Sequence, residues 1–354
     1  MAFDRKLRAR RERGLFTVAV VFSSLVWAVL VVSVVGLAYG AALAFGIFVA
    51  HALFLAHVRG NGVRVSERQL PELHARVLAA AQKLGLDRTP EVYVVQAGGV
   101  LNAFATKLLS RRFVVLHSEL VDQCRDPRQL DFVVGHEVGH LAAGHLRFTW
   151  LVAPFLIVPW LGTAYLRARE YTADRCGFLV AGDLEQSIRG LVVLAAGGNV
   201  AAQANLGAFA GQVRETGGFW MAVLELSASH PYLCKRAAAL AAVSNPAIAT
   251  SVGRHPLAWL LAPVLGAASG GPAAAPMMVV AIIGILSAIA VPNFLKYQER
   301  ARAVRSGAAA AQAAVEPSTS TALTTEDREA LNWVQQVRLQ IAAKDRARAG
   351  APTP

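Results

Sequence analysis

The segment Gly135–His145 reads GHEVGHLAAGH and contains two histidines four residues apart, His136 and His140. Residues four apart on a helix lie on one face with Cβ atoms about 5–6 Å apart, so both imidazoles can bind the same metal ion. Glu137, one position further round the helix, can accept a proton from a water at that ion. The spacing therefore predicts a hydrolytic site that uses one Zn²⁺ per chain.

A helix that would hold these ligands is predicted to begin at Asp126 and Pro127. Aspartate is a favoured N-cap, proline is favoured at the first helical position, and Gln129 is placed to complete a capping box. Apolar residues then recur at helical spacing and provide a buried face: Leu130, Val133, Val134, Val138 and Leu141. The two histidines therefore fall in the middle of the helix.

A catalytic zinc site usually has three protein ligands and a water, so one ligand is still to be found. His145 lies about 140° round the helix from His140, which turns it away from the metal, and we interpret it as a structural residue or a neighbour of a ligand. Glu170, in the run RAREYTADRCG, is a better third ligand. Asp174 follows it by one helical turn and can accept the second ring N–H of a ligand histidine. The alternative, an ordinary surface pair, is disfavoured by the nearby HEVGH segment.

Four segments occur in the order typical of one family. They are LNAFA at Leu101–Ala105, GHEVGH, REYTADRCG, and SHPYLCKR at Ser229–Arg236. Together they resemble the gluzincin-type integral-membrane zinc proteases that include HtpX and the CaaX prenyl proteases. The resemblance covers residues 64–242, and the joint occurrence of the four segments is far more specific than any one of them.

This resemblance implies a role for each matching residue. It makes three residues the zinc ligands: His136, His140 and Glu170. It assigns Glu137 as the general base, Asp174 as the residue that orients a ligand, and His230 as a stabiliser of the transition state. It also implies that substrate pairs with the edge of a small sheet, next to three binding residues: Asn102, Ala103 and Phe104. His117, at a strand end, is interpreted as a packed or surface histidine.

The composition indicates membrane segments. The 354 residues are 55% hydrophobic and 16% charged, with a mean hydropathy of +0.43, which is too apolar for an average soluble domain. The net charge is +12, and the segments Met1–Gly14 (net +4) and Lys296–Arg305 (net +3) carry seven of these charges beside apolar runs. Such charges orient membrane segments and contact lipid, so no nucleic-acid partner is expected.

The run Leu15–Val58 has no Lys, Arg, Asp or Glu and is about twice as long as one helical crossing requires. It predicts a transmembrane hairpin that turns near Gly36–Gly40. Basic residues at both ends place the catalytic part in the cytoplasm, so we predict a multi-pass protein of a bacterial inner membrane. The three cysteines, Cys124, Cys176 and Cys234, are widely spaced, which favours a reduced cytoplasmic setting over a disulfide framework.

The patterns in the rest of the sequence predict helices and two short strands. A helix is expected over residues 66–84, strands over 91–96 and 112–117, and a helical cover of the site over 186–226. The apolar segment 146–166 contains Pro154 and Pro159. Zinc ligands flank it on both sides and must meet at one ion, so we expect it to rest on the membrane or re-enter it.

Near the C-terminus, residues 277–297 resemble the N-terminal helix of type IV pilins. The characteristic acidic residue is replaced by Ala275, and Gly271 stands where an aromatic residue should follow the peptidase cut. These departures favour a simple membrane helix over a processed pilin. A linker rich in Ala, Ser and Thr follows, and then an amphipathic helix within residues 325–346.

We therefore predict a mainly α fold with a small β-sheet, that is, an α+β gluzincin-like metalloprotease domain, plus transmembrane helices. Four regions are expected: a basic N-terminus and hairpin (1–60), the protease domain with membrane-associated segment 146–166 (61–255), a C-terminal membrane segment (256–300), and a linker with an amphipathic helix (301–354).

The predicted function is that of a membrane-anchored zinc endopeptidase that cleaves proteins or peptides in membrane-protein quality control. One alternative is a non-enzymatic membrane scaffold linked to pilus or secretion assembly. It is disfavoured because the zinc set is complete and the pilin set is not. A prenyl-protein protease is disfavoured because the predicted membrane segments are too few to enclose a lipid-binding chamber. The sequence does not fix the oligomeric state.

Overall fold

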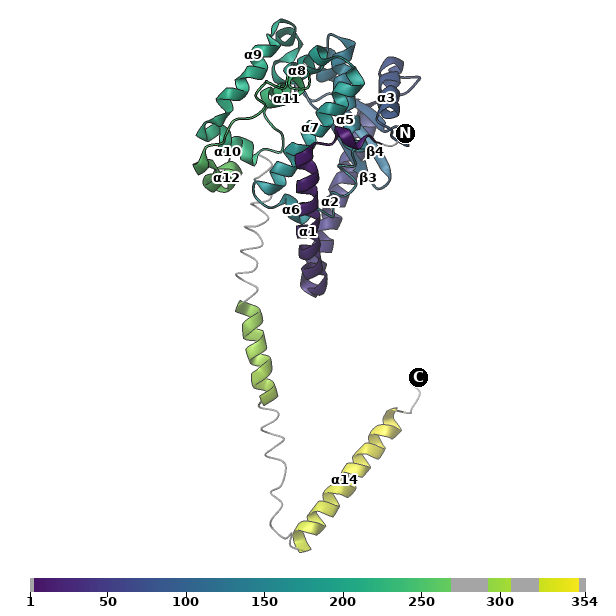
Figure 1. Ribbon diagram of the computed structural model, residues 1–354. Coiled ribbons are helices and arrows are strands. Elements are labelled where there is room, and N and C mark those ends of the chain that lie inside the picture. The colour runs from purple at the N-terminus through teal and green to yellow at the C-terminus, as the bar shows by residue number, and fades with distance from the viewer. Residues whose placement is uncertain (1–2, 269–291, 307–324, 350–354) are drawn as a thin grey trace. The chain divides into compact units, whose positions relative to one another are not determined.

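The computed structural model describes residues 3–268, 292–306 and 325–349, in two compact units that divide after Ile282 (Figure 1). The helices of the first unit are η1 Arg5–Leu7, α1 Arg10–Val32, α2 Val34–Asn61, α3 Pro71–Lys83, α4 Ser118–Gln123, α5 Pro127–Ala142, α6 Ala153–Leu156, α7 Leu161–Ala181, α8 Leu184–Gln203, α9 Leu206–Gly211, η2 Gln212–Gly217, α10 Phe219–Ser227, α11 Leu233–Ala241 and α12 Pro256–Ala268. Its strands are β1 Val63–Arg64, β2 Glu91–Val95, β3 Ala103–Leu108 and β4 Arg111–His117. The predicted fold class, mainly α with a small sheet, is confirmed.

The four strands form one mixed sheet in the order β1-β2-β4-β3. β2 and β4 are parallel with Val92 opposite Val114, and β3 is antiparallel to β4 with Phe104 opposite Val115. β2 and β4 were predicted. β1 and β3 were not predicted. β1 has only two residues, and β3 is half-buried along its whole length, so it lacks the alternation of buried and exposed side chains that marks a strand.

The two faces of the sheet pack against different parts of the chain. Val92, Val114 and Leu116 belong to the main core, which also contains the buried face of α5. Val115 and its neighbours Tyr93 and Phe113 pack instead against Leu55 and Val58, near the end of α2. The sheet is thus held between the metal-site helix and the second apolar helix.

The start of α3 differs from the prediction. The helix expected over residues 66–84 begins at Pro71, because Ser66 and Gln69 form reciprocal backbone hydrogen bonds in a turn. Leu70 then adopts a left-handed conformation with φ 62°. The proline occupies the first helical position, where its missing N–H costs nothing.

Helices α5 and α7 approach closely because glycines line their contact. A Cβ added at Gly139 would lie 2.6 Å from Cβ of Cys176, and one added at Gly135 would lie 2.6 Å from Cβ of Val180. Gly177 on α7 is equally tight against the carbonyl oxygen of Phe132. Only glycine fits these positions without a shift, and this close packing brings α7 within reach of the histidines of α5.

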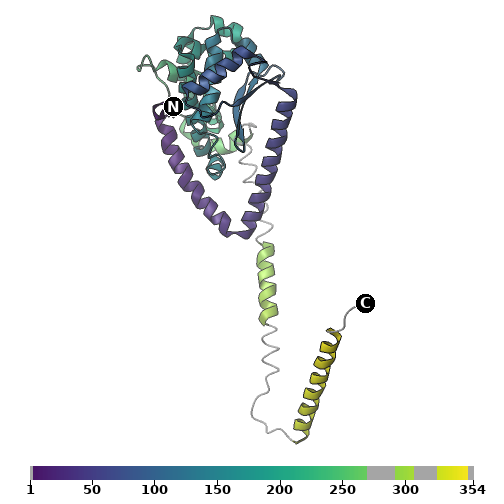
Figure 2. The same ribbon diagram turned by 90° about the vertical axis from the view of Figure 1, so that its right-hand side faces the viewer.

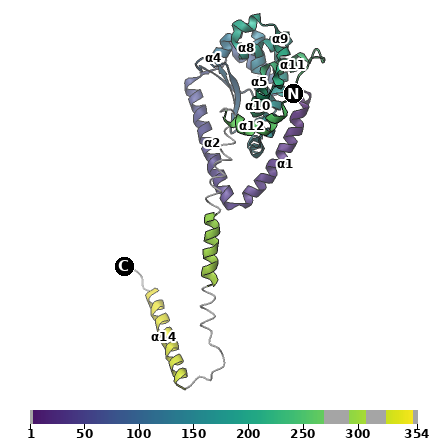
Figure 3. The same ribbon diagram turned by 90° about the vertical axis from the view of Figure 1, so that its left-hand side faces the viewer.

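The helices α1 and α2 form the predicted apolar hairpin, and both are long and apolar enough to cross a membrane. They turn at Ser33, and the prediction of a turn near Gly36–Gly40 is wrong. The reason is local, since Ser33 ends α1 and its hydroxyl accepts a hydrogen bond from the Gly36 N–H at the start of α2. Figures 2 and 3 show the two helices diverging from this turn to different parts of the rest of the first unit.

The segment between α5 and α7 folds back along α1. The Phe155 N–H donates to the Ser23 hydroxyl at 3.1 Å, and the Trp27 indole donates to the Leu151 carbonyl oxygen at 2.9 Å. The segment contains one short helix, α6, and the predicted ligands on the two helices that it joins still converge. This arrangement agrees with the expectation that segment 146–166 does not separate the ligands, whereas its contact with a membrane stays a prediction.

The C-terminal predictions are described only in part. Helix α12 packs through Ala258 and Ala262 against α10. Residues 277–291 of the pilin-like segment and the linker at 307–324 lie outside the described residues, while residues 292–306 are helical. In the second unit, α14 spans Thr325–Ala349, which confirms a helix where an amphipathic one was predicted.

Candidate metal centre

The helix that carries the two histidines begins as predicted. Asp126 caps α5 by accepting a hydrogen bond from the Arg128 N–H at 2.8 Å, and Pro127 is the first helical residue. Gln129 does not return to the N-cap as a capping box requires. Its side-chain oxygen instead accepts from the Arg125 N–H at 3.1 Å. The helix thus starts nine residues before the first histidine.

The three predicted ligands converge, His136 and His140 from α5 and Glu170 from α7. The two histidine Nε2 atoms are 3.2 Å apart. The Glu170 carboxylate oxygens lie 3.5 Å from Nε2 of His136 and 3.4 Å from Nε2 of His140. One ligand atom from each residue lies within 4.8 Å of the others, and all three side chains are largely buried.

These residues fit a zinc ion. Two imidazole nitrogens and one carboxylate oxygen are donors that zinc accepts in catalytic sites. The Oε2 atom of Glu170 is buried and makes no hydrogen bond with any residue in the described ranges. Burial alone would raise the pKa of Glu170, but contacts with His136, His140 and Arg236 hold it well below its usual value, so the carboxylate is charged.

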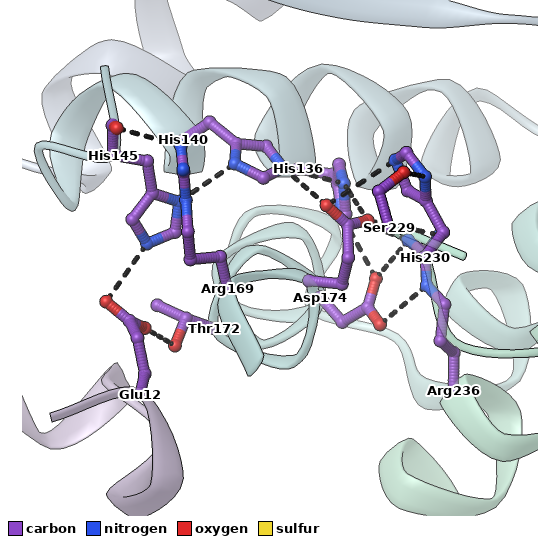
Figure 4. Close-up of polar contacts among 11 residues, drawn as sticks. Glu12, His136, His140, His145, Arg169, Thr172, Asp174, Ser229, His230 and Arg236 are labelled. Atoms are coloured by element: carbon purple, nitrogen blue, oxygen red, sulfur yellow. Dashed lines mark hydrogen bonds and ion pairs between the residues drawn. The ribbon is translucent and has the colours of Figure 1, made fainter. Parts of the chain in front are cut away.

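Asp174 orients the first histidine. Its Oδ1 lies 3.0 Å from Nδ1 of His136, so the ring carries its proton on Nδ1 and presents the Nε2 lone pair to the other ligands (Figure 4). Burial alone would lower the pKa of His136, but the contacts with the carboxylates of Asp174 and Glu170 outweigh burial and raise this pKa to about 9. A proton and a metal ion therefore compete for Nε2.

Arg236, from α11, was not predicted as a site residue. Its guanidinium makes a bidentate pair with Asp174, with Nε to Oδ2 at 2.9 Å and Nη2 to Oδ1 at 2.6 Å, and its Nη1 lies 3.4 Å from Glu170. Burial would raise the pKa of Asp174, but the charge of Arg236 lowers it, so Asp174 is ionised too. The arginine thus compensates two buried carboxylates, and its place at the end of the SHPYLCKR segment was the available signal.

His145 lies off the metal face, as predicted, and it contacts a ligand. Its Nδ1 is 2.8 Å from Nδ1 of His140, on the opposite side of that ring from Glu170. Its Nε2 lies 3.3 Å from Oε1 of Glu12, which was not predicted as a site residue. Glu12 lies in the basic N-terminal segment, where nothing in the pattern distinguishes a buried carboxylate from a solvated one.

The two predicted catalytic side chains lie at the edge of this group. Glu137 is buried on α5 beside His136 and makes no hydrogen bond or ion pair with another described residue. His230 follows α10, is exposed, and has its Nε2 3.7 Å from Oε1 of Glu170, while Ser229 Oγ lies 2.9 Å from its Nδ1. The catalytic roles of these two side chains stay predictions.

The predicted substrate-binding residues begin the edge strand of the sheet. Asn102 precedes β3, and Ala103 and Phe104 are its first two residues. Within the described chain β3 pairs only with β4, so its outer edge is free, and it packs beside α5. The Phe104 ring faces Phe54 of α2 at 5.9 Å and His117 at 6.4 Å, so its side chain packs inward.

Comparison with known proteins gives one family match. The family model described as "Peptidase family M48" matches residues 67–161 and 151–244, which together are half of the chain. The chain is 32% identical over 174 residues to the "Plastoglobule-localized metallopeptidase 48, chloroplastic" of Arabidopsis thaliana, covering 44% of this chain and 49% of that protein. It is 30% identical over 102 residues to the "Protease HtpX homolog" of Methanocaldococcus jannaschii, covering 27% and 35%.

The matched part thus includes all the converging ligands, and the chain spans half or less of the length of these relatives. No solved structure matches significantly.

Proposed function

Because the chain belongs to peptidase family M48, we propose that it is a membrane-anchored, zinc-dependent endopeptidase that cleaves protein or peptide substrates. The observation that carries the proposal is the convergence of His136, His140 and Glu170 from two helices, with Glu137 beside them. By its resemblance to HtpX-like proteases, we propose damaged or misassembled membrane proteins as the substrate class.

His136, His140 and Glu170 would hold the zinc ion. When bound, zinc supplies Lewis-acid chemistry, which polarises a scissile carbonyl and makes a water more acidic. Glu137 accepts the proton of the attacking water and then delivers it to the leaving amine. His230, exposed at the rim of the ligands, donates a hydrogen bond to the oxyanion. The free edge of β3 aligns the extended substrate through backbone hydrogen bonds.

Metal analysis and a cleavage assay on the detergent-purified chain test this proposal together. We expect about one zinc per chain and cleavage of a casein-type substrate, both removed by a chelator and restored by added zinc. A protein that is folded and binds zinc but cleaves no unfolded substrate would refute the peptidase assignment. A folded protein that binds no zinc would refute the metal centre as well.

We propose that α1 and α2 insert into a bilayer and that the part of the first unit formed by the α6 segment, α10 and α12 rests on the surface of that bilayer. Three large apolar side chains of the first unit are strongly exposed: Trp150 (68%), Trp220 (71%) and Leu260 (73%). They belong to the α6 segment, α10 and α12, which Figure 1 shows on the side toward which the α1–α2 hairpin extends. Exposed tryptophan is typical of a membrane interface.

We propose that the first unit lies on the cytoplasmic side of a bacterial inner membrane, because basic residues stand at both ends of the apolar hairpin. We expect a cysteine introduced at Arg64 to resist a membrane-impermeant thiol reagent in intact cells and to react after lysis. A second cysteine, introduced at Ser318 in a separate variant, reports on which side of the membrane the C-terminal part lies. Its reaction in intact cells would mean that the chain after α2 crosses the membrane an odd number of times. Labelling of the Arg64 site in intact cells would contradict a cytoplasmic active site.

A further inference from the structure

A second group of buried polar side chains lies at the Nδ1 side of the His140 ring (Figure 4), whereas Glu170 lies at its Nε2 side. Its members come from three parts of the chain: Glu12 from the first turn of α1, His145 from the turn after α5, and Thr172 from α7. All three are buried, and Glu12 is completely so. A buried carboxylate needs hydrogen-bond donors or positive charges around it, and one of the groups beside Glu12 contacts a predicted metal ligand.

The contacts form a continuous path from the carboxylate to a metal ligand. Nε2 of His145 lies 3.3 Å from Oε1 of Glu12, and Nδ1 of His145 lies 2.8 Å from Nδ1 of His140. Nε2 of His145 and Oε1 of Glu12 are both buried, and neither has a hydrogen-bond partner among the described residues, so this ring nitrogen faces the carboxylate as its ion-pair contact. Only one proton can lie between the two Nδ1 atoms.

Glu12 is itself held in place from several sides. The Thr172 hydroxyl donates to its Oε2, and Thr172 in turn accepts from the Ala9 N–H at 2.9 Å. Arg8 balances the charge, with Nη1 3.0 Å from Oε1 of Glu12, and also donates to the Ala143 carbonyl oxygen at the end of α5. The start of α1 is therefore fastened to both helices that carry the ligands.

We propose that Glu12 is a positioning residue for the metal centre, acting through His145. Its carboxylate keeps the proton of His145 on Nε2, so Nδ1 of His145 accepts a hydrogen bond from Nδ1–H of His140. Nε2 of His140 is then free of a proton and available to a metal ion. This inference rests on the proposed function, since it concerns the same zinc site.

The opposite tautomer shows why a carboxylate is needed at this position. A proton on Nδ1 of His145 would point at Nδ1 of His140 and force the proton of that ring onto Nε2, where it would block the metal. A neutral His145 ring carries one proton, and the two places for it are Nε2, which faces Glu12, and Nδ1, which faces His140. Asp174 performs the equivalent task directly for His136.

A consequence is that zinc binding and docking of the N-terminal helix are linked. Glu12 belongs to α1, which continues as the first of the two apolar helices. A metal ion that favours the ordered His140 also favours the docked start of α1, and the linkage is reciprocal.

The test is zinc affinity, measured by competition with a chromogenic chelator on the full chain in detergent. Glu12→Gln should weaken zinc binding about 10-fold, at the lower end of the effect of groups behind a ligand. The glutamine amide can present either an oxygen or an N–H to His145, so it no longer fixes the tautomer. Asp4→Asn, which removes an exposed carboxylate from the same segment, should leave the affinity unchanged.

A double-variant cycle separates positioning from simple support of the fold. His145→Leu should itself weaken zinc binding, and in that background Glu12→Gln should cost nothing further. Thermal unfolding of the metal-free variants reports any loss of fold separately. If Glu12→Gln does not fold, Glu12→Asp should still show a smaller loss of affinity.

Additive losses in the cycle, or wild-type affinity in a folded Glu12 variant, would overturn the inference. In either case a wild type that binds zinc and cleaves peptide would leave the proposed function standing. A wild type that does neither would overturn both.

Discussion

The Glu137→Gln variant is expected to keep its fold and its zinc and to lose peptide cleavage by about 10²–10⁴-fold, the usual contribution of a general base. Glutamine has the size of glutamate, so α5 should pack as before, but its amide cannot accept the proton of the attacking water. Glu137 is buried beside His136 and makes no hydrogen bond with another described residue. Its replacement therefore breaks no hydrogen bond in the described part of the chain and removes only a charge that interacts with Arg236, which keeps its pairs with Glu170 and Asp174.

The measurement is the cleavage rate of an unfolded protein substrate, with zinc content and thermal unfolding determined on the same samples. Glu72→Gln on α3 makes the same chemical change at an exposed position and should retain the wild-type rate. Equal rates for Glu137→Gln and the wild type would exclude Glu137 as the base, whereas a loss of zinc would make it a structural residue of the site.

Local signals made the centre of the site predictable. The Asp126–Pro127 start, the helical spacing of apolar residues and the interval between His136 and His140 all lie within one helix. Each signal reports on neighbours in the chain, where geometry is fixed by the helix itself. The pair Glu170 and Asp174 was accessible for the same reason, because both lie on one face of α7.

Contacts between distant parts of the chain could not be read in the same way. Arg236 is 62 residues from Asp174, and Glu12 is 133 residues before His145. An arginine or glutamate has no local pattern that shows which charge it will meet after folding, and most such residues are solvated. The close approach of α5 and α7 is an intermediate case. The small residues Gly135 and Gly139 are visible in the sequence, but the contact of Gly139 with Cys176 is not.

Loss of the third ligand should have the largest effect on the metal. Glu170→Ala is expected to lower zinc affinity by more than the roughly 10- to 100-fold that outer groups contribute, so that the purified variant holds little zinc. The buried carboxylate has one oxygen near Nε2 of each histidine, and no other acidic group on the described residues takes its place in this cluster. Arg236 keeps its bidentate partner Asp174, so the variant should still fold.

Zinc content after dialysis, and affinity by chelator competition, measure this loss. Asp174→Asn provides the comparison within the site, because it leaves all three ligands and should fall in the 10- to 100-fold range. It also leaves the charge of buried Arg236 less compensated, so its thermal stability should drop more than that of Glu170→Ala. Glu185→Ala on α8 removes an exposed carboxylate that pairs with Arg189, so it is the matched surface control and should bind zinc like the wild type. If Glu170→Ala retains full zinc while His145→Leu loses it, the third ligand has been assigned to the wrong side of His140.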